Sequence, residues 1–91
     1  MMTNDTNQPV ANLRDGINRR IKATVWRNES ENGVFYSVEL SRTYENAAGE
    51  LQDSHSFSGS EILQVSRLAE KAYDLIAERT AADKQARKEA A

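Results

Sequence analysis

The chain has 91 residues, enough for one small domain with a thin hydrophobic core. Twelve Lys and Arg residues are set against fourteen Asp and Glu residues, so the chain lacks the basic excess typical of dedicated double-stranded DNA binders. It has no cysteine, no apolar run of membrane-spanning length and no apolar signal segment. Disulfides and thiolate metal sites are therefore excluded, and we expect a cytoplasmic protein without a membrane partner.

Residues 1–12, MMTNDTNQPVAN, are polar, include one proline and show no periodicity. This composition predicts a disordered N-terminal tail. The Asp15-Gly16 pair that follows is a turn signal. The pattern leaves open whether a short strand precedes residue 17.

Residues 21–44, IKATVWRNESENGVFYSVELSRTY, predict two strands joined at Asn32-Gly33. Asn-Gly tolerates positive φ at both turn positions, as a tight hairpin requires. Apolar and polar residues alternate along both arms, so each arm has one face for a core. If Ile21, Ala23 and Val25 face the core, Lys22 and Trp26 lie on the opposite face.

Gly49 predicts a second hairpin turn, followed by a third strand over residues 51–57. Leu51, Asp53, His55 and Phe57 share one side of that strand. If Leu51 and Phe57 face the core, His55 lies on its rim. We expect it to be a structural hydrogen-bonding residue, not a ligand or a base.

The period changes at Ser58. Ser58-Gly-Ser-Glu61 has the spacing of a helix capping box, with Ser60 as a competing cap. Apolar residues then recur at helical spacing from Ile62 to Ile76, which predicts an amphipathic helix. Residues 80–91 favour a helix but lack an apolar stripe, so we expect a frayed extension.

These elements predict an α+β fold: a three- or four-stranded antiparallel β-meander followed by one C-terminal amphipathic helix. The single domain spans residues 13–79, between the tail and the extension. The helix stripe is too long to be hidden by three strands, which predicts a homodimer, with a monomeric sheet curled around the helix as the alternative. The expected dimer interface consists of Val65, Leu68, Ala72 and Leu75.

The sequence contains no catalytic constellation. Its single histidine has no positioned acid beside it, one histidine cannot make a zinc site, and no glycine-rich phosphate loop is present. We expect neither an enzyme nor a metal, cofactor or small-molecule substrate.

Basic and aromatic residues gather on and beside the first hairpin. Single-stranded nucleic acids are bound by stacking bases on aromatic rings and by cations along the phosphates. Trp26 and Phe35 could stack bases, with Arg20, Lys22 and Arg27 nearby. Alternatively, the aromatic residues could cover a protein interface, because exposed aromatic patches mark such surfaces too.

IKATVW, VFYSVELSRTYENAAGEL and the capped C-terminal helix resemble the transcriptional positive-cofactor-four family of single-stranded DNA-binding coactivators. The resemblance covers residues 13–77. Trp26-Arg-Asn, Phe35-Tyr-Ser-Val, Ser41-Arg-Thr-Tyr44 and Ser56-Phe-Ser-Gly59 are more closely similar to a widespread set of small bacterial proteins of uncharacterised function.

The coactivator resemblance implies a dimer whose helices meet and whose curved sheets cradle unwound DNA. By position, its contacts would be Lys22, Trp26, Arg27, Phe35 and Arg42. The family's last strand tends to be basic and glycine-rich, whereas residues 51–57 are Leu-Gln-Asp-Ser-His-Ser-Phe. We therefore expect a non-catalytic protein that binds single-stranded DNA or RNA in transcription or DNA maintenance. The alternative is a homodimeric protein-interaction module without nucleic-acid binding.

Overall fold

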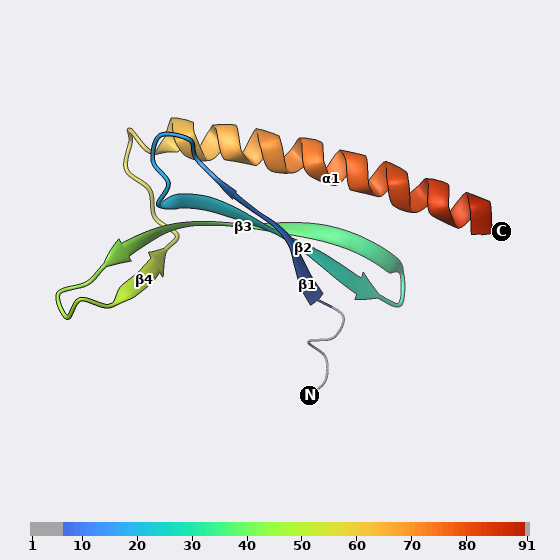
Figure 1. Cartoon of the computed structure of the whole chain (residues 1–91), viewed down its shortest axis with the longest axis horizontal. Helices are drawn as coiled ribbons and strands as arrows, with labels where there is room; N and C mark the ends of the chain where they lie inside the picture. The colour runs from blue at the N-terminus through green and yellow to red at the C-terminus, as the bar shows by residue number, and fades with distance from the viewer. Residues whose placement is uncertain (1–6, 91) are drawn as a thin grey trace.

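The structure, a computed structural model, describes residues 7–90. Four antiparallel strands form one open sheet in sequence order, and one helix crosses a face of that sheet (Figure 1). The strands are β1 (Asn7–Arg14), β2 (Ile21–Ser30), β3 (Gly33–Glu45) and β4 (Leu51–Ser54), and the helix is α1 (Ile62–Ala90). The α+β meander with a single C-terminal helix is thus confirmed.

The core lies between β2 and the first half of α1. Ile21, Ala23 and Val25 have no exposed surface, as their alternation predicts. From α1, Val65, Leu68 and Ala72 are also buried, while Leu13, Leu40 and Phe57 pack around the edge of the cluster. Burying a Val, Leu or Ile side chain contributes about 1.5–3 kcal/mol, so these few residues supply much of the stability.

This packing corrects the expected dimer interface. Val65, Leu68 and Ala72 are no more than 8% exposed within one chain, and Leu75 is half-buried. The sheet of the same chain therefore covers the stripe that was assigned to a second copy. The stripe is hidden because β1 adds a fourth strand to the three that the sequence predicted, and α1 packs on it as well.

The N-terminal prediction is also corrected, because residues 7–12 belong to β1. Ala11 pairs with Val25 and Leu13 with Ala23, which places both apolar side chains on the side of α1. The register shifts between Pro9 and Ala11. That irregularity breaks the alternation that would reveal a strand in the sequence. Residues 1–6 of the expected tail lie outside the described residues.

The first hairpin turn differs by one residue from the expected one. Ser30 pairs with Gly33, so Glu31 and Asn32 form the turn. Gly33 has a φ of +117°, but Asn32 does not have positive φ, so the expected pair of positive φ values is wrong. The Ser30 hydroxyl stabilises this turn, since Oγ accepts from Asn32 N at 3.2 Å and donates to Gly33 O at 3.2 Å. Gly49 has a φ of +83°, as its turn requires.

The last strand is shorter than expected, because β4 ends at Ser54. The Ser54 hydroxyl accepts from Ser56 N at 3.1 Å, a local bond that turns the chain out of the sheet. Phe57 still packs against the core, from the connecting segment and not from a strand. Leu51, which was expected beside it, is 71% exposed.

At the start of α1, one of the two hydrogen bonds of the predicted capping box is present. Ser58 N donates to Glu61 Oε1 at 2.8 Å, and this bond lowers the pKa of Glu61. Glu61 Oε1 also lies 3.4 Å from Arg42 Nε, which links the helix start to β3.

At the other end α1 continues through residues 80–90 without a break. There Tyr36 of β3 donates its hydroxyl to Asp83 Oδ2 at 2.7 Å.

Candidate nucleic-acid interface

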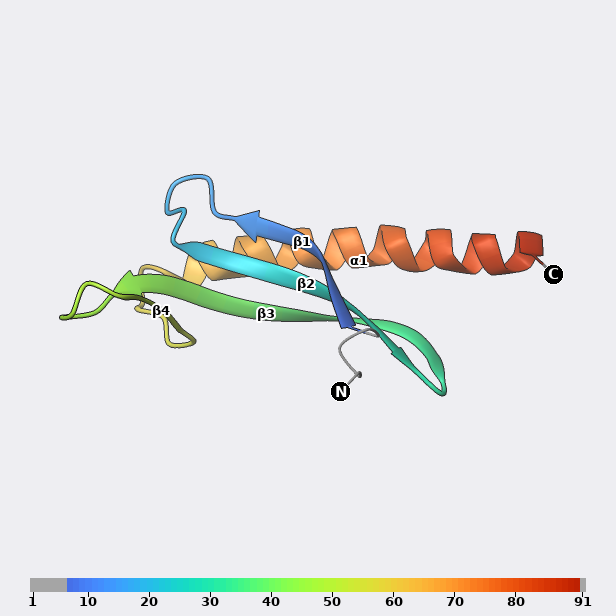
Figure 2. The ribbon, with the colours of Figure 1, turned by 60° about the horizontal axis from the view of Figure 1, so that its bottom comes forward.

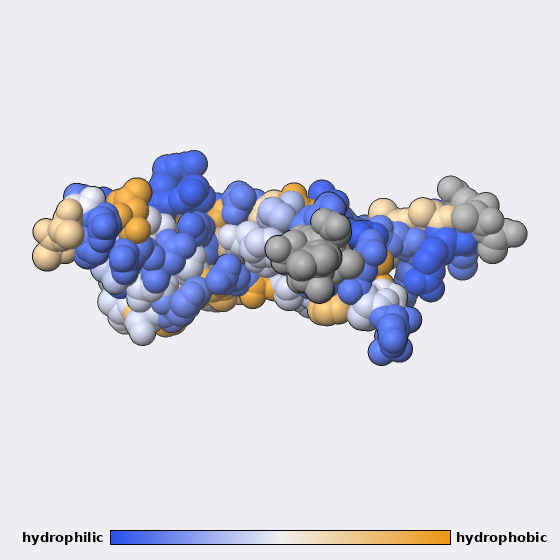
Figure 3. All heavy atoms as spheres, turned by 90° about the horizontal axis from the view of Figure 1, so that it is seen from below, coloured by the Kyte–Doolittle hydropathy of each residue, from blue (hydrophilic) through white to orange (hydrophobic). Residues whose placement is uncertain are grey.

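One face of the sheet is not covered by α1, and we call it the outer face. Since Ile21, Ala23 and Val25 point to the helix, Lys22, Thr24 and Trp26 occupy the outer face of β2. The strand register adds side chains from the neighbouring strands, namely Asn12, Arg14, Phe35, Ser37 and Glu39. Seen from this side, the surface is mainly hydrophilic, with hydrophobic residues at its borders (Figure 3). The outer face is thus a polar surface into which two aromatic residues are set.

Trp26 and Phe35 are diagonal neighbours on the outer face. Trp26 lies opposite Ser37 of β3, and Phe35 is two residues from Ser37 on the same strand. Diagonal cross-strand residues are roughly 7–8 Å apart, within reach of aromatic side chains. Trp26 is half-buried and Phe35 is 52% exposed. Both rings therefore have surface on which a flat group can stack.

A basic hollow of about 550 Å³ lies at the opposite end of the outer face. Its cations come from β1, the β1–β2 loop and β2: Arg14, Arg19, Arg20 and Lys22. Thr43, Leu51, Gln52 and Asp53 complete the lining. Lys22 and Trp26 are four residues apart on β2, or about 13 Å along a strand. The hollow and the aromatic pair thus lie in line on one face.

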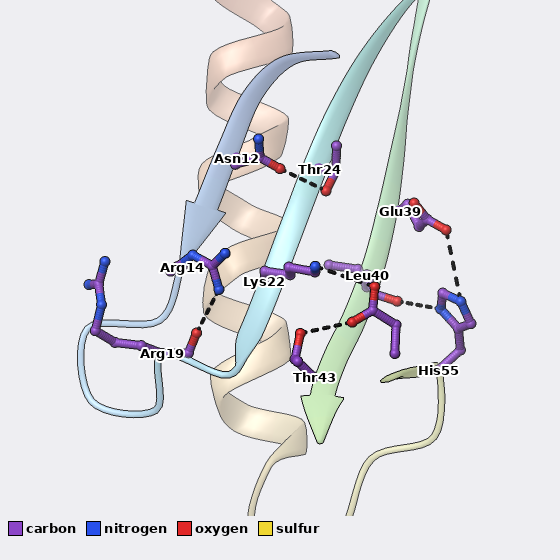
Figure 4. A network of polar contacts seen from close by, with 10 residues as sticks. Asn12, Arg14, Arg19, Lys22, Thr24, Glu39, Leu40, Thr43 and His55 are labelled. Atoms are coloured by element: carbon purple, nitrogen blue, oxygen red, sulfur yellow. Dashed lines mark hydrogen bonds and ion pairs between the residues drawn. The ribbon is translucent and has the colours of Figure 1, made fainter. Parts of the chain in front are cut away.

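Backbone hydrogen bonds shape the loop that carries Arg19 and Arg20. Asp15 is buried and its Oδ2 accepts from Asn18 N at 2.8 Å and from Ile17 N at 3.0 Å. These bonds lower the pKa of Asp15, aided by the charges of Lys71 and Arg67. Across the loop, Arg14 Nη1 donates to Arg19 O at 3.0 Å (Figure 4). The Asp15-Gly16 turn signal is therefore what positions the arginines.

Asp53 is the one carboxylate among the described residues that line the basic hollow. Thr43 Oγ1 donates to its Oδ1 at 2.8 Å, and Lys22 Nζ lies 3.3 Å from its Oδ2. The Thr43 hydrogen bond is the main cause of the lowered pKa of Asp53, with Lys22 adding to it. Asp53 stays ionised at neutral pH and offsets the charge of Lys22. The three arginines remain as the excess positive charge.

His55 lies at the border of the outer face next to β4. Its Nδ1 lies 2.8 Å from Leu40 O and must donate there, because a carbonyl oxygen only accepts (Figure 4). Its Nε2 is 3.8 Å from Glu39 Oε2. This geometry matches the expected structural role, since the ring satisfies a backbone carbonyl that no strand reaches.

Two of the expected contact residues lie on the other face, with α1. Arg27 Nη1 is 2.6 Å from Glu29 Oε2, and Arg27 also interacts with the Tyr36 hydroxyl. Arg42 pairs with Glu61 and stacks over the Tyr44 ring at 5.6 Å. Both guanidinium groups are engaged by other side chains of the chain on that face. The structure thus brings Arg20, Lys22, Trp26 and Phe35 to one face and separates Arg27 and Arg42 from them.

Arg14 and Arg19 join the site although sequence reasoning did not select them as contacts. Arg14 lies opposite Lys22 because β1 exists. The signal was the alternation of Ala11 and Leu13 with Asn12 and Arg14, too short to establish a strand by itself.

Among residues 7–90, no group of three or more His, Cys, Asp or Glu side chains could hold a metal ion. In the same range, the helix is not apolar enough to cross a membrane. No protein-family model, curated protein or solved structure matches the chain.

Proposed function

We propose that this protein is a non-catalytic single-stranded nucleic-acid-binding protein that uses the outer face of its sheet. The observation that supports this proposal is the alignment of the basic hollow with Trp26 and Phe35 on one uncovered surface. Phosphates would bind at the arginines and bases would stack on the two rings.

The charge distribution supports a single-stranded ligand. The chain as a whole has a net charge of −2, so a positive field is local, and the hollow gathers four cations. Double-stranded DNA binders usually contact many phosphates over a broad basic surface, whereas the hollow offers four cations beside one carboxylate. A few phosphate contacts combined with stacking is the arrangement by which unpaired strands are bound.

The aromatic pair supports binding with little sequence preference. Stacking on an aromatic ring contributes about 1–3 kcal/mol per base and accepts every base, because each has a flat face. Around the rings, Asn28 Nδ2 already donates to Ser37 Oγ at 3.0 Å, and Thr24 Oγ1 already donates to Asn12 Oδ1 at 3.0 Å. These side chains are partly occupied with each other, which leaves fewer groups for reading base edges.

The test is a fluorescence anisotropy titration of labelled oligothymidine against salt concentration. Three engaged arginines predict a slope of log K against log salt of about −2, from roughly 0.7 counterions per contact on a single strand. The Arg19→Ala/Arg20→Ala variant should flatten that slope by more than half. Arg87→Ala/Lys88→Ala, which removes the same charge from exposed positions on α1, is the matched control and should retain the wild-type slope.

The stacking part of the proposal has its own variant. Phe35→Ala should weaken binding of every sequence alike, by about 1–3 kcal/mol if one base is lost from the ring. Tyr73→Ala removes a 74% exposed aromatic ring from α1 and should leave the binding of a short oligothymidine unchanged. Equal losses in both variants would contradict stacking on the outer face.

The second candidate is a homodimeric protein-interaction module without nucleic-acid binding. Exposed apolar side chains outside the aromatic pair favour it, among them Ile62 at 55% and Tyr73 at 74%. It predicts no change in anisotropy at any salt concentration. The oligothymidine titration therefore decides between the two candidates.

A further inference from the structure

Most of β3 has a strand on only one side. β2 pairs with β3 from Gly33 to Arg42, whereas β4 pairs only with Arg42–Glu45. Among the described residues, no strand therefore flanks residues 33–41 on the β4 side. Figure 2 shows this part of β3 as the border of the sheet between β4 and the hairpin tip.

The backbone groups of alternate residues point out of this border. Thr43 N donates to Arg20 O at 2.9 Å, so odd-numbered residues of β3 bond to the β2 side. Even-numbered residues therefore direct their backbone groups to the β4 side, where Leu40 O bonds to His55. The β2–β3 register runs without a shift, which directs the N–H and C=O groups of Val34, Tyr36 and Val38 outward.

The side chains along this border lack the usual protection of an edge strand. Residues 34–38 are Val-Phe-Tyr-Ser-Val, with no charge and no proline. Val34 and Val38 are each 38% exposed. The opposite edge, β1, carries Pro9 and a register shift, both of which discourage pairing with another strand. Of the strand edges within residues 7–90, the β3 border is the one longer than four residues that lacks such protection.

An apolar strip of α1 lies above the same border. Tyr73, Ile76, Ala77, Thr80, Ala81 and Lys84 line a hollow of about 420 Å³ on the helix. Thr80 and Lys84 also line a hollow of about 290 Å³ together with Val34 and Tyr36. The other flank of α1, with Leu63, Gln64 and Arg67, lies beside the β1–β2 loop. The helix strip and the β3 border therefore form one continuous surface.

We propose that a second copy of this chain binds this surface, with β3 pairing antiparallel to the partner's β3 about a two-fold axis at Tyr36. This register sets Val34 opposite the partner's Val38 and uses the three outward-pointing residues on each copy. It leaves Leu40 O bonded to His55. Residues 34–38 carry no charge and match themselves in this register, which favours a second copy over a foreign segment. A two-fold contact also closes after two chains, whereas pairing of β3 with the partner's β1 would continue into a fibre.

The α1 strips strengthen the choice of a second copy. A two-fold axis perpendicular to the sheet keeps both helices on one face and brings their strips toward each other across the joined strands. One contact then covers both the open backbone edge and the exposed Tyr73 on each chain. A single foreign strand would cover only the edge.

The test is the mass of the full chain in sedimentation at micromolar concentration. The wild type should show twice the chain mass of 10.2 kDa. Val38→Lys and Tyr73→Lys should each return the mass to that of one chain while the circular dichroism spectrum is retained. Leu63→Lys adds the same charge to a 62% exposed residue on the other flank of α1 and should leave the dimer intact.

A wild-type chain that sediments at 10.2 kDa overturns the proposal, as does a Val38→Lys variant that remains dimeric. Cross-linking tests the register even if a lysine variant fails to fold. The chain has no cysteine, so Tyr36→Cys introduces a single thiol at the two-fold axis. Paired strand residues lie about 5.5 Å apart between Cα atoms, within disulfide range. Mild oxidation should cross-link Tyr36→Cys and not Leu63→Cys, and the reverse result contradicts this interface.

Discussion

Asp15 shows how one side chain positions a functional surface. Its carboxylate accepts two backbone hydrogen bonds within the β1–β2 loop, and Asp15 N donates to Ile21 O at 3.1 Å. Arg19 and Arg20 reach the basic hollow from this loop. Asp15 is therefore a positioning residue for the cations, although it carries the wrong charge to contact a phosphate.

The acid dependence of stability follows from three carboxylates. The pKa values of Asp15, Asp53 and Glu61 are all lowered, chiefly by hydrogen bonds that their ionised forms accept. Each group thus stabilises the fold above its unfolded-state pKa of about 4, and that stabilisation is lost as the pH falls through the lower folded-state value. We expect a melting temperature that is flat from about pH 7 to pH 5 and falls below about pH 4.

Asp15→Asn should lower the melting temperature at neutral pH and make the acid decline shallower, because one of the three linked groups is gone. Thermal melts followed by circular dichroism between neutral and acidic pH measure both effects. An acid decline of unchanged steepness would show that Asp15 does not contribute to it.

Leu68 tests the position of the core. It is 1% exposed between α1 and β2, so Leu68→Ala should destabilise the chain by about 2–5 kcal/mol in urea unfolding. Leu63 is on the same helix but is 62% exposed, and Leu63→Ala should change stability by less than about 0.5 kcal/mol. Similar losses in the two variants would mean that another face of α1 packs on the sheet.

At the scale of single residues, much of the site was readable from the sequence. Alternation alone places Lys22, Trp26 and Phe35 away from the core. It also places Arg27 on the side of Val25, two residues earlier, so its separation from the outer face was implicit in the pattern. The same alternation places Arg42 on the side of Leu40, two residues earlier, and the register that pairs Arg42 with Ile21 agrees with it.

At the scale of elements, the sequence defines the meander and the helix start but not the ends of the sheet. β1 contains Pro9 and a register shift, so its alternation holds for only four residues. β4 ends early because the Ser54 hydroxyl accepts a hydrogen bond from the backbone N–H of Ser56, which period-two alternation does not encode. The capping box, in contrast, is local, and Glu61 bonds to Ser58 N as its spacing predicts.

The Tyr36–Asp83 hydrogen bond is a specific link between the later half of α1 and the sheet. Tyr36→Phe removes that bond and should cost about 0.5–1.5 kcal/mol. Amide hydrogen exchange measures which part of α1 loses stability in this variant. Amides around residues 80–88 should exchange faster in the variant, while those around Leu68 stay protected. Uniform acceleration along α1 would show that the helix responds as one unit.

At the scale of the whole molecule, the two proposals reinforce each other without depending on each other. Pairing at the β3 border would join two outer faces into one surface, with Phe35 of each copy next to the two-fold axis and a basic hollow at each far end. An oligothymidine long enough to cross the two-fold axis contacts both outer faces. It should then bind more tightly than short oligothymidines that each contact one outer face. Val38→Lys should abolish that gain while leaving the affinity for a short oligomer unchanged.

The most direct test of the central claim uses Trp26, the only tryptophan in the chain, as its own reporter. Excess oligothymidine at low salt should quench Trp26 fluorescence, and the quenching should saturate together with the anisotropy of the labelled strand. Arg19→Ala/Arg20→Ala should shift both curves to higher oligothymidine concentration. If fluorescence and anisotropy both stay constant with excess oligothymidine, the outer face does not bind single-stranded nucleic acid.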